Sequence, residues 1–136
     1  MIELEFAKGY FIDENGKVYS NKGKGQRNKN KTVPLYELKP RFCKNGYCRV
    51  YLTCNDGNRK DFYIHRLVAK YFVSNPNGYK YVDHINFNRC DNRAINLQWL
   101  TSKQNTERTL IYEHCTRNDK GQFVSAFDYK SVLNIV

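Results

Sequence analysis

Apolar and polar residues alternate along the first half of the chain, and turn-forming residues interrupt the alternation at short intervals. Residues 9–20 hold two short apolar segments on either side of Asn15-Gly16, a step that is typical of β-hairpins. Residues 35–63 repeat the alternation, with more turn-forming residues at 55–58. This pattern predicts a small antiparallel sheet in the N-terminal half.

The period of the pattern changes over residues 65–73. From Leu67 onward, apolar residues fall at positions i, i+1, i+4 and i+5, which places them on one face of a short helix. The turn-forming residues 74–78 then predict the end of this helix.

A second change of period follows. Residues 79–85 begin as a short strand, residues 86–96 form a polar loop, and residues 97–100 alternate as a second strand. Thr101-Ser102-Lys103-Gln104 has the form of a capping box and opens a helix that runs to about Arg108. The predicted order is strand, loop, strand, helix.

One tract, residues 21–31, has no apolar period and carries only positive charge. It therefore predicts a loop, and contact with DNA is favoured over a purely solvated surface. Its basic residues are Lys22, Lys24, Arg27, Lys29 and Lys31.

Composition narrows the class of partner. The chain has 136 residues, 23 Lys and Arg against 13 Asp and Glu, and a formal net charge of +10, so a polyanion is the expected partner. No apolar run approaches the roughly 20 residues that a spanning helix requires, and the N-terminus does not resemble a signal peptide. We therefore expect a cytoplasmic protein that binds nucleic acid and no membrane. The five cysteines contain no C-x-x-C pair, so we expect small, buried, reduced side chains and no zinc ribbon.

Candidate chemistry gathers at the end of the first predicted strand of the strand–loop–strand–helix unit. Asp83 and His84 are neighbours there, and adjacent strand residues point to opposite faces. Asn105 follows 21 positions after His84, in the predicted helix. A helix that folds back across the hairpin would bring all three polar groups together.

These segments together resemble the HNH nucleases, which use the ββα-metal fold, and most closely their phage and intron-encoded branch. The residues that carry the resemblance are Val82-Asp83-His84-Ile85, Asp91-Asn92-Arg93, Asn96-Leu97-Gln98-Trp99-Leu100-Thr101 and Gln104-Asn105. Residues 65–76 are similar to the helix that leads into this motif, and residues 9–40 to a modular DNA-binding element that often accompanies it. The resemblance spans about residues 9 to 108.

The resemblance implies a role for each matched residue. His84 would be the general base, Asp83 a metal ligand, and Asn96 a structural residue that ties the loop and orients the histidine. Asn105 stands where many relatives have histidine. An amide oxygen suits Mg²⁺ better than Zn²⁺, so Mg²⁺, with Mn²⁺ as an alternative, is the expected cofactor.

Basic residues near the motif are candidates for DNA binding, namely Arg89, Arg93 and Lys103. For Arg93, a phosphate contact and a salt bridge to Asp91 are equally compatible with the sequence.

The sequence and the resemblance together predict an α+β fold. Residues 1–60 would form a small antiparallel β lobe that binds DNA, residues 61–110 the connecting helix and the ββα-metal HNH unit, and residues 111–136 a C-terminal extension. The expected function is metal-dependent cleavage or nicking of double-stranded DNA by a homing or free-standing phage endonuclease, as a monomer or a homodimer in the host cytoplasm. The alternatives are a low-specificity packaging or defence nuclease and an inactive DNA-binding module.

Overall fold

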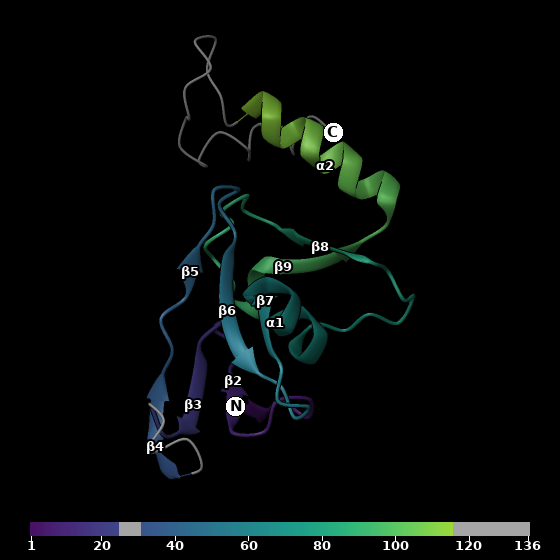
Figure 1. Ribbon diagram of the computed structural model, residues 1–136. Coiled ribbons are helices and arrows are strands. Elements are labelled where there is room, and N and C mark those ends of the chain that lie inside the picture. Colours follow the sequence, from purple (N-terminus) through teal and green to yellow (C-terminus); the bar gives the residue numbers. More distant parts are fainter. Residues whose placement is uncertain (25–30, 116–136) are drawn as a thin grey trace.

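The computed structural model of the chain describes residues 1–24 and 31–115 (Figure 1). It contains three antiparallel sheets and two α-helices, which confirms the expected α+β class. The strands of the first sheet are β1 (Ile2–Glu3), β2 (Tyr10–Ile12), β3 (Val18–Lys22) and β4 (Thr32–Glu37). The second sheet holds β5 (Arg41–Phe42), β6 (Cys48–Thr53) and β7 (Arg59–Tyr63). The third pairs β8 (Tyr81–His84) with β9 (Leu97–Leu100).

The first sheet has the order β1-β2-β3-β4, and the predicted hairpin at Asn15-Gly16 joins β2 to β3. The basic tract, residues 21–31, does not begin as a loop. Lys22 still belongs to β3 and pairs with Thr32 of β4. Its ammonium group donates to the carbonyl oxygen of Thr53 at 3.3 Å and lies 4.5 Å from the centre of the Tyr10 ring. The backbone pairing and these contacts outweigh the polar composition. Of the predicted DNA-binding residues, Arg27 and Lys29 lie outside the described residues.

In the second sheet, β6 lies between β5 and β7. Its alternation is strict, with Cys48, Val50 and Leu52 buried on one face. The other face carries Arg49 and Tyr51 and looks away from the core. The sequence pattern predicted this alternation.

The predicted first helix is α1 (Ile64–Phe72). Its buried face carries Ile64, Leu67 and Val68, together with His65. It contacts β6 and β7 on one side and β8 and β9 on the other, so it stands between the N-terminal sheets and the third sheet.

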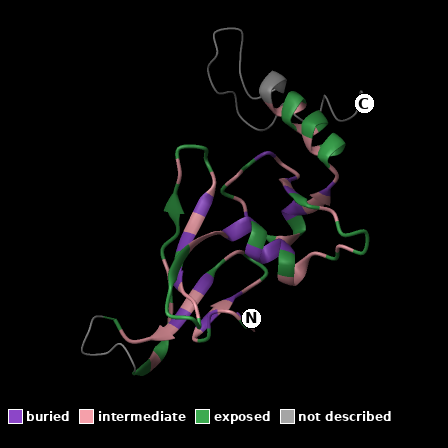
Figure 2. Cartoon of the chain, turned by 45° about the vertical axis from the view of Figure 1, so that its right-hand side comes forward, coloured by how far each residue is buried: buried purple, intermediate pink, exposed green. Residues whose placement is uncertain are grey.

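The last part of the described chain runs β8, the 3-10 helix η2 (Ala94–Asn96), β9 and α2 (Ser102–Cys115). The predicted capping box is present, because Thr101 and Gln104 each accept a hydrogen bond from the other's backbone N–H, at 3.2 and 3.0 Å. Most of α2 is exposed (Figure 2). Neither helix of the described ranges has the length and apolar character needed to cross a membrane.

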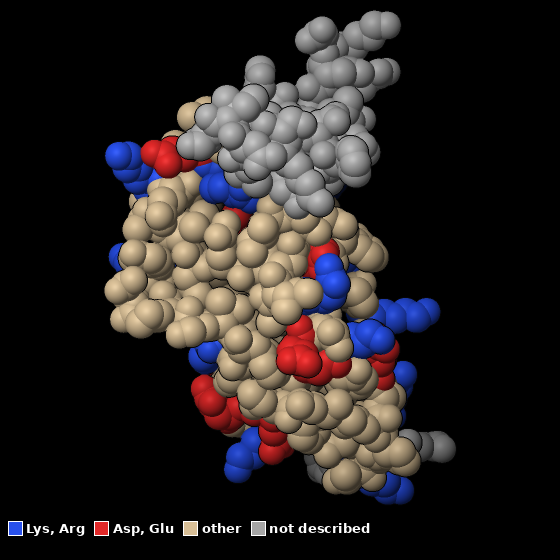
Figure 3. Space-filling view, turned by 180° about the vertical axis from the view of Figure 1, so that it is seen from behind, with Lys and Arg blue, Asp and Glu red and all other residues tan. Residues whose placement is uncertain are grey.

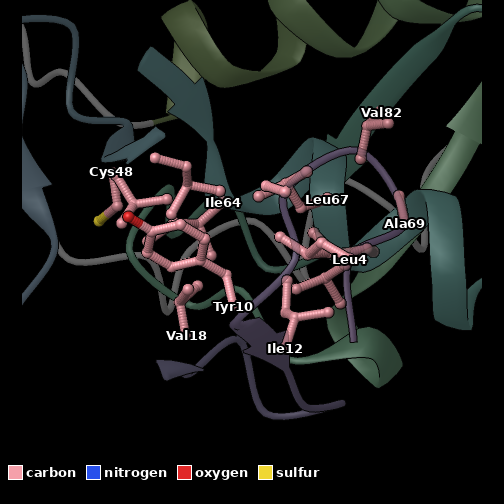
Figure 4. Close-up of a cluster of buried hydrophobic side chains, with 14 residues drawn as sticks. Leu4, Tyr10, Ile12, Val18, Cys48, Ile64, Leu67, Ala69 and Val82 are labelled. Atoms are coloured by element: carbon pink, nitrogen blue, oxygen red, sulfur yellow. The ribbon is translucent and has the colours of Figure 1, made fainter. Parts of the chain in front are cut away.

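One hydrophobic core joins all three sheets (Figure 4). Ile12 and Val18 of the first sheet, Leu52 of the second and Val82 of the third belong to the same cluster as the apolar face of α1. The boundary proposed near residue 60 therefore does not separate two cores. Of the cysteines expected to be buried, Cys48 lies in this core, whereas Cys90 is exposed.

The turn between β2 and β3 allows a direct test of packing against the loop that precedes η2. Gly16 and Gly57 both have a left-handed backbone, with φ of +81° and +86°. A Cβ atom at Gly16 would lie 2.8 Å from the backbone oxygen of Asn92, whereas one at Gly57 would meet nothing within 4 Å. We expect Gly57→Ala to lower the free energy of unfolding by about 1 kcal/mol through backbone strain alone. Gly16→Ala should lower it by about 3 kcal/mol, because the clash adds to the strain.

Urea denaturation of the two variants measures this difference. Equal losses for the two variants would contradict the contact between the turn and Asn92.

Candidate active site

A small pocket of about 50 Å³ lies where β8 ends beneath α2. The pocket is lined by Asp83, His84 and Asn105. Asn105 is distant from the other two in sequence, and in an isolated strand the neighbours Asp83 and His84 would point to opposite sides. Helix α2 packs over the β8–β9 hairpin (Figure 1), and Asn105 of this helix lines the pocket together with the last residues of β8.

The imidazole of His84 is almost fully buried, with 4% of its residue surface exposed. Its Nε2 lies 2.8 Å from the side-chain oxygen of Asn92. Because that oxygen only accepts, Nε2 carries the proton, and Nδ1 keeps the lone pair that a general base requires. Burial lowers the pKa of His84 below its usual value, while the bond to Asn92 opposes this effect.

Aromatic rings also pack around His84. The His65 ring lies 5.1 Å from that of His84 and packs nearly parallel to Tyr47 at 4.8 Å. Burial, and next the neighbouring His84, lower the pKa of His65 to about 3. His65 is therefore neutral at physiological pH, and its neutral ring can pack against the base without repelling it.

Two side chains fix the carboxylate of Asp83. Gln98, its direct partner across the β8–β9 pair, donates to Oδ2 at 2.8 Å, and Arg108 donates from Nε to the same oxygen at 3.0 Å. Among the described residues, no hydrogen bond involves Oδ1 of Asp83. This leaves one carboxylate oxygen available in the pocket.

Asn96 is buried at the base of the loop between β8 and β9. Its amide nitrogen donates to the side-chain oxygen of Asn86 and to the carbonyl of Asp91, at 2.9 and 2.8 Å, and its oxygen accepts from the backbone N–H of Asn86 at 3.0 Å. Asn96 therefore closes the loop, but Asn92 makes the direct bond to His84. The catalytic contribution of Asn96 stays a prediction.

The predicted basic residues take three different positions. Arg89 lines the pocket, and its guanidinium lies 4.7 Å from the ring centres of both Tyr47 and Tyr112. Arg93 forms a two-bond ion pair with Asp91, at 2.8 Å for each bond, which is the salt-bridge alternative of the sequence analysis. The side chain of Lys103 is exposed on the first turn of α2 and does not line the pocket.

The residues present fit a hard, oxygen-preferring cation. Asp83 offers a carboxylate oxygen and Asn105 an amide oxygen, and Mg²⁺ commonly completes its shell with water and phosphate oxygens. In the described parts of the chain, no three His, Cys, Asp or Glu side chains come close enough to hold a metal ion.

Comparison with known proteins agrees with this geometry. The family model described as HNH endonuclease matches residues 62–107, from the end of β7 through the middle of α2. An uncharacterized HNH endonuclease of Acanthamoeba polyphaga mimivirus, L245, is 39% identical over 135 residues, which is 99% of this chain and 36% of that protein. Residues 62–107 therefore form an HNH endonuclease segment, which contains Asp83, His84 and Asn105.

Two further likenesses point to homing endonucleases among the HNH proteins. DNA endonuclease I-HmuI of Bacillus phage SP01 is 36% identical over 101 residues, which is 74% of this chain and 51% of that protein. The solved structure described as DNA binding and cleavage by the HNH homing endonuclease I-HmuI superposes with a TM-score of 0.61 and 28% identity, over 98% of this chain and 66% of that one. The chain spans about a third of the mimivirus relative and half of the phage relative.

Several residues of this HNH site were not singled out from the sequence. Asn92 and Gln98 stand in matched segments, and the pairing of Gln98 with Asp83 could have been deduced from the hairpin register. Arg108 follows Asn105 by three positions, a spacing that places both on one helix face. Tyr47 gives no such signal, because it comes from the turn between β5 and β6, more than 30 residues before His84.

The neutral state of His65 makes stability depend on pH. In the unfolded chain the pKa of a histidine is about 6.5, so the unfolded state gains a proton as the pH falls while native His65 does not. Between pH 7 and pH 5 this difference lowers the free energy of unfolding by about 2 kcal/mol. We expect His65→Phe, which keeps an aromatic ring in the stack, to lose about 2 kcal/mol less than the wild type over this range.

Urea denaturation at the two pH values measures the effect. Equal losses for the variant and the wild type would show that His65 titrates normally in the folded protein.

Proposed function

We propose that this chain is a metal-dependent endonuclease of the homing or free-standing phage type, which hydrolyses phosphodiester bonds of duplex DNA. The observation that carries the proposal is the meeting of Asp83, His84 and Asn105 in one pocket, within a segment that matches the HNH endonuclease family. The likeness to a homing endonuclease solved for DNA binding and cleavage supports DNA as the substrate.

His84 would take a proton from the attacking water. Its Nδ1 holds the free lone pair, because Nε2 is engaged by Asn92. The lowered pKa keeps this nitrogen unprotonated at neutral pH, so the base is ready without prior loss of a proton. The ring of His65 packs against the imidazole at a tilt of 54°, with the ring centres 5.1 Å apart, and would limit its rotation.

Asp83 and Asn105 would hold the divalent cation. When bound, this cation would neutralise the charge that develops on the phosphate and on the leaving oxygen. Arg89 lines the same pocket and would attract the phosphate by charge, with its guanidinium kept in place between Tyr47 and Tyr112.

Positive charge is not spread evenly over the molecule. On the face seen in Figure 3, acidic side chains lie beside basic ones and a broad area carries no charge. The outer face of β5–β6–β7 carries Arg41, Arg49 and Arg59 with a single carboxylate, Asp61, at its centre. We infer that this outer face is a further part of the DNA-binding surface.

Aromatic rings order the arginines of this face and connect it to the pocket. The guanidinium groups of Arg41 and Arg49 each lie 4.3 Å from a tyrosine ring centre, over Tyr51 and Tyr63. The Tyr63 ring lies 5.6 Å from Tyr47, which lines the pocket. The side chains of an antiparallel sheet can enter the major groove, so the face fits duplex DNA that continues from the pocket.

Cleavage of a supercoiled plasmid in the presence of Mg²⁺ or Mn²⁺ tests the nuclease. We expect His84→Ala and Asp83→Ala to lower the cleavage rate by about 100-fold or more, because each removes a group that acts on the reacting atoms. Asp56→Ala is the matched control and should cleave as the wild type does, since Asp56 lies in the exposed turn between β6 and β7. EDTA should abolish cleavage by all proteins.

Wild-type activity in His84→Ala would contradict the assigned base, and cleavage in EDTA would contradict the metal requirement. An inactive wild type on plasmids that carry random genomic inserts would instead favour a DNA-binding module.

Duplex binding at several salt concentrations tests the sheet face. Arg59 and Lys60 are adjacent exposed cations whose side chains leave opposite faces of β7. We expect Arg59→Gln to weaken binding and to lower the slope of log K against log salt by about 1, the value of one phosphate contact. Lys60→Gln, which removes the same charge from the other face, should change the slope less. Equal effects of the two changes would contradict a specific role of the outer face.

A further inference from the structure

Arg108 is the most constrained cation at the site. Both its side chain and that of Asp83 are 12% exposed, and their ion pair measures 3.0 Å. The Nη2 atom also donates to the backbone carbonyls of His84 and Ile85, at 3.3 and 2.8 Å. The guanidinium lies 4.0 Å from the centre of the Phe87 ring.

These contacts hold the positive charge next to the carboxylate. The carbonyls belong to the last residue of β8 and to the residue that follows it, so Arg108 is bound to the same short piece of backbone that carries Asp83 and His84. A long, exposed lysine could swing into solvent, but a planar guanidinium fixed by three acceptors and a ring stays in position.

The charges that line the pocket do not favour a free cation. Asp83 contributes one negative charge, Arg89 and Arg108 contribute one positive charge each, and Asn105 is neutral. A divalent ion on the remaining oxygen of Asp83 would share that carboxylate with the guanidinium. The guanidinium and the divalent ion carry charges of the same sign, and at such short range they repel strongly in a site that is partly shielded from water.

We propose that Arg108 is a built-in counter-ion of Asp83, the proposed metal ligand. In this position it lowers the affinity of the DNA-free protein for a divalent cation. The inference rests on the proposed function, because it takes Asp83 and Asn105 as the residues that hold the metal. It follows that a phosphodiester anion, which offsets the positive charge of the pocket, favours occupation of the site by the cation.

Titration of the full chain with Mn²⁺ in the absence of DNA, followed by the electron paramagnetic resonance of the free ion, tests the inference without any activity. Arg108→Gln removes the charge and keeps hydrogen-bonding groups, and we expect it to bind Mn²⁺ about tenfold more tightly than the wild type. Arg108→Lys keeps the charge but holds it less firmly, so its affinity should lie between those of the wild type and Arg108→Gln. Arg66→Gln, a loss of the same charge on α1 outside the pocket, should have no effect beyond about twofold.

Circular dichroism would first establish that each variant is folded. If Arg108→Gln fails to fold, Arg108→Met, whose side chain still covers Phe87, replaces it with the same expected gain in affinity. Asp83→Asn serves as the reference for the site and should weaken Mn²⁺ binding strongly.

The variants at positions 108 and 83 test the counter-ion and the metal site separately. One outcome is that neutral variants at position 108 bind Mn²⁺ as the wild type does or more weakly, while Asp83→Asn loses binding. This would overturn the proposed role of Arg108 as a counter-ion and leave the proposed metal site intact. Unchanged binding in Asp83→Asn would overturn the metal site itself, and the counter-ion with it.

Discussion

The burial of α1 is the constraint on which the other elements depend. This short helix is the element that packs against the second and third sheets, and its apolar face completes one core with residues from all three sheets. The hydrophobic effect therefore fixes the N-terminal sheets and the β8–β9 hairpin with respect to each other. Because His65 stands on the buried part of α1, the same packing brings its ring against His84.

The loop that carries Asn92 is held from both sides. From within, Asn96 bonds to Asn86 and Asp91 and closes the loop. From outside, the β2–β3 turn reaches it, where the backbone N–H of Ala94 donates to the carbonyl of Glu14 at 2.7 Å. Since Asn92 bonds to His84, the N-terminal half supports the geometry of the candidate site through this loop.

Electrostatics at the site combine fixed cations with a single carboxylate. Arg108 lies against Asp83, and Arg89 lies between two aromatic rings, so neither guanidinium depends on the substrate for its position. Such preorganised charge acts on a phosphate without the reorganisation that a flexible side chain would require. The same arrangement separates the roles of the neighbours in β8, with Asp83 among charged groups and His84 among neutral aromatic rings.

The sequence by itself determined the local elements and pointed to the candidate site residues. The Asn15-Gly16 hairpin, the helix that begins near His65, the β8–β9 unit and the Thr101 capping box all follow from short-range patterns, because turn geometry, helical period and end-capping are properties of neighbouring residues. The order of Asp83, His84 and Asn105 could also be read from the sequence, since the motif is contained in one continuous segment.

Only the tertiary structure decided which distant groups complete the site. Tyr47 and His65 reach His84 through the packing of the second sheet and α1, and Arg108 reaches Asp83 through the crossing of α2 over the hairpin. No local period encodes such contacts, because they depend on how buried faces fit together across the core. The extension of β3 to Lys22 has the same origin, since pairing with β4 and contact with Tyr10 override the polar character of the tract.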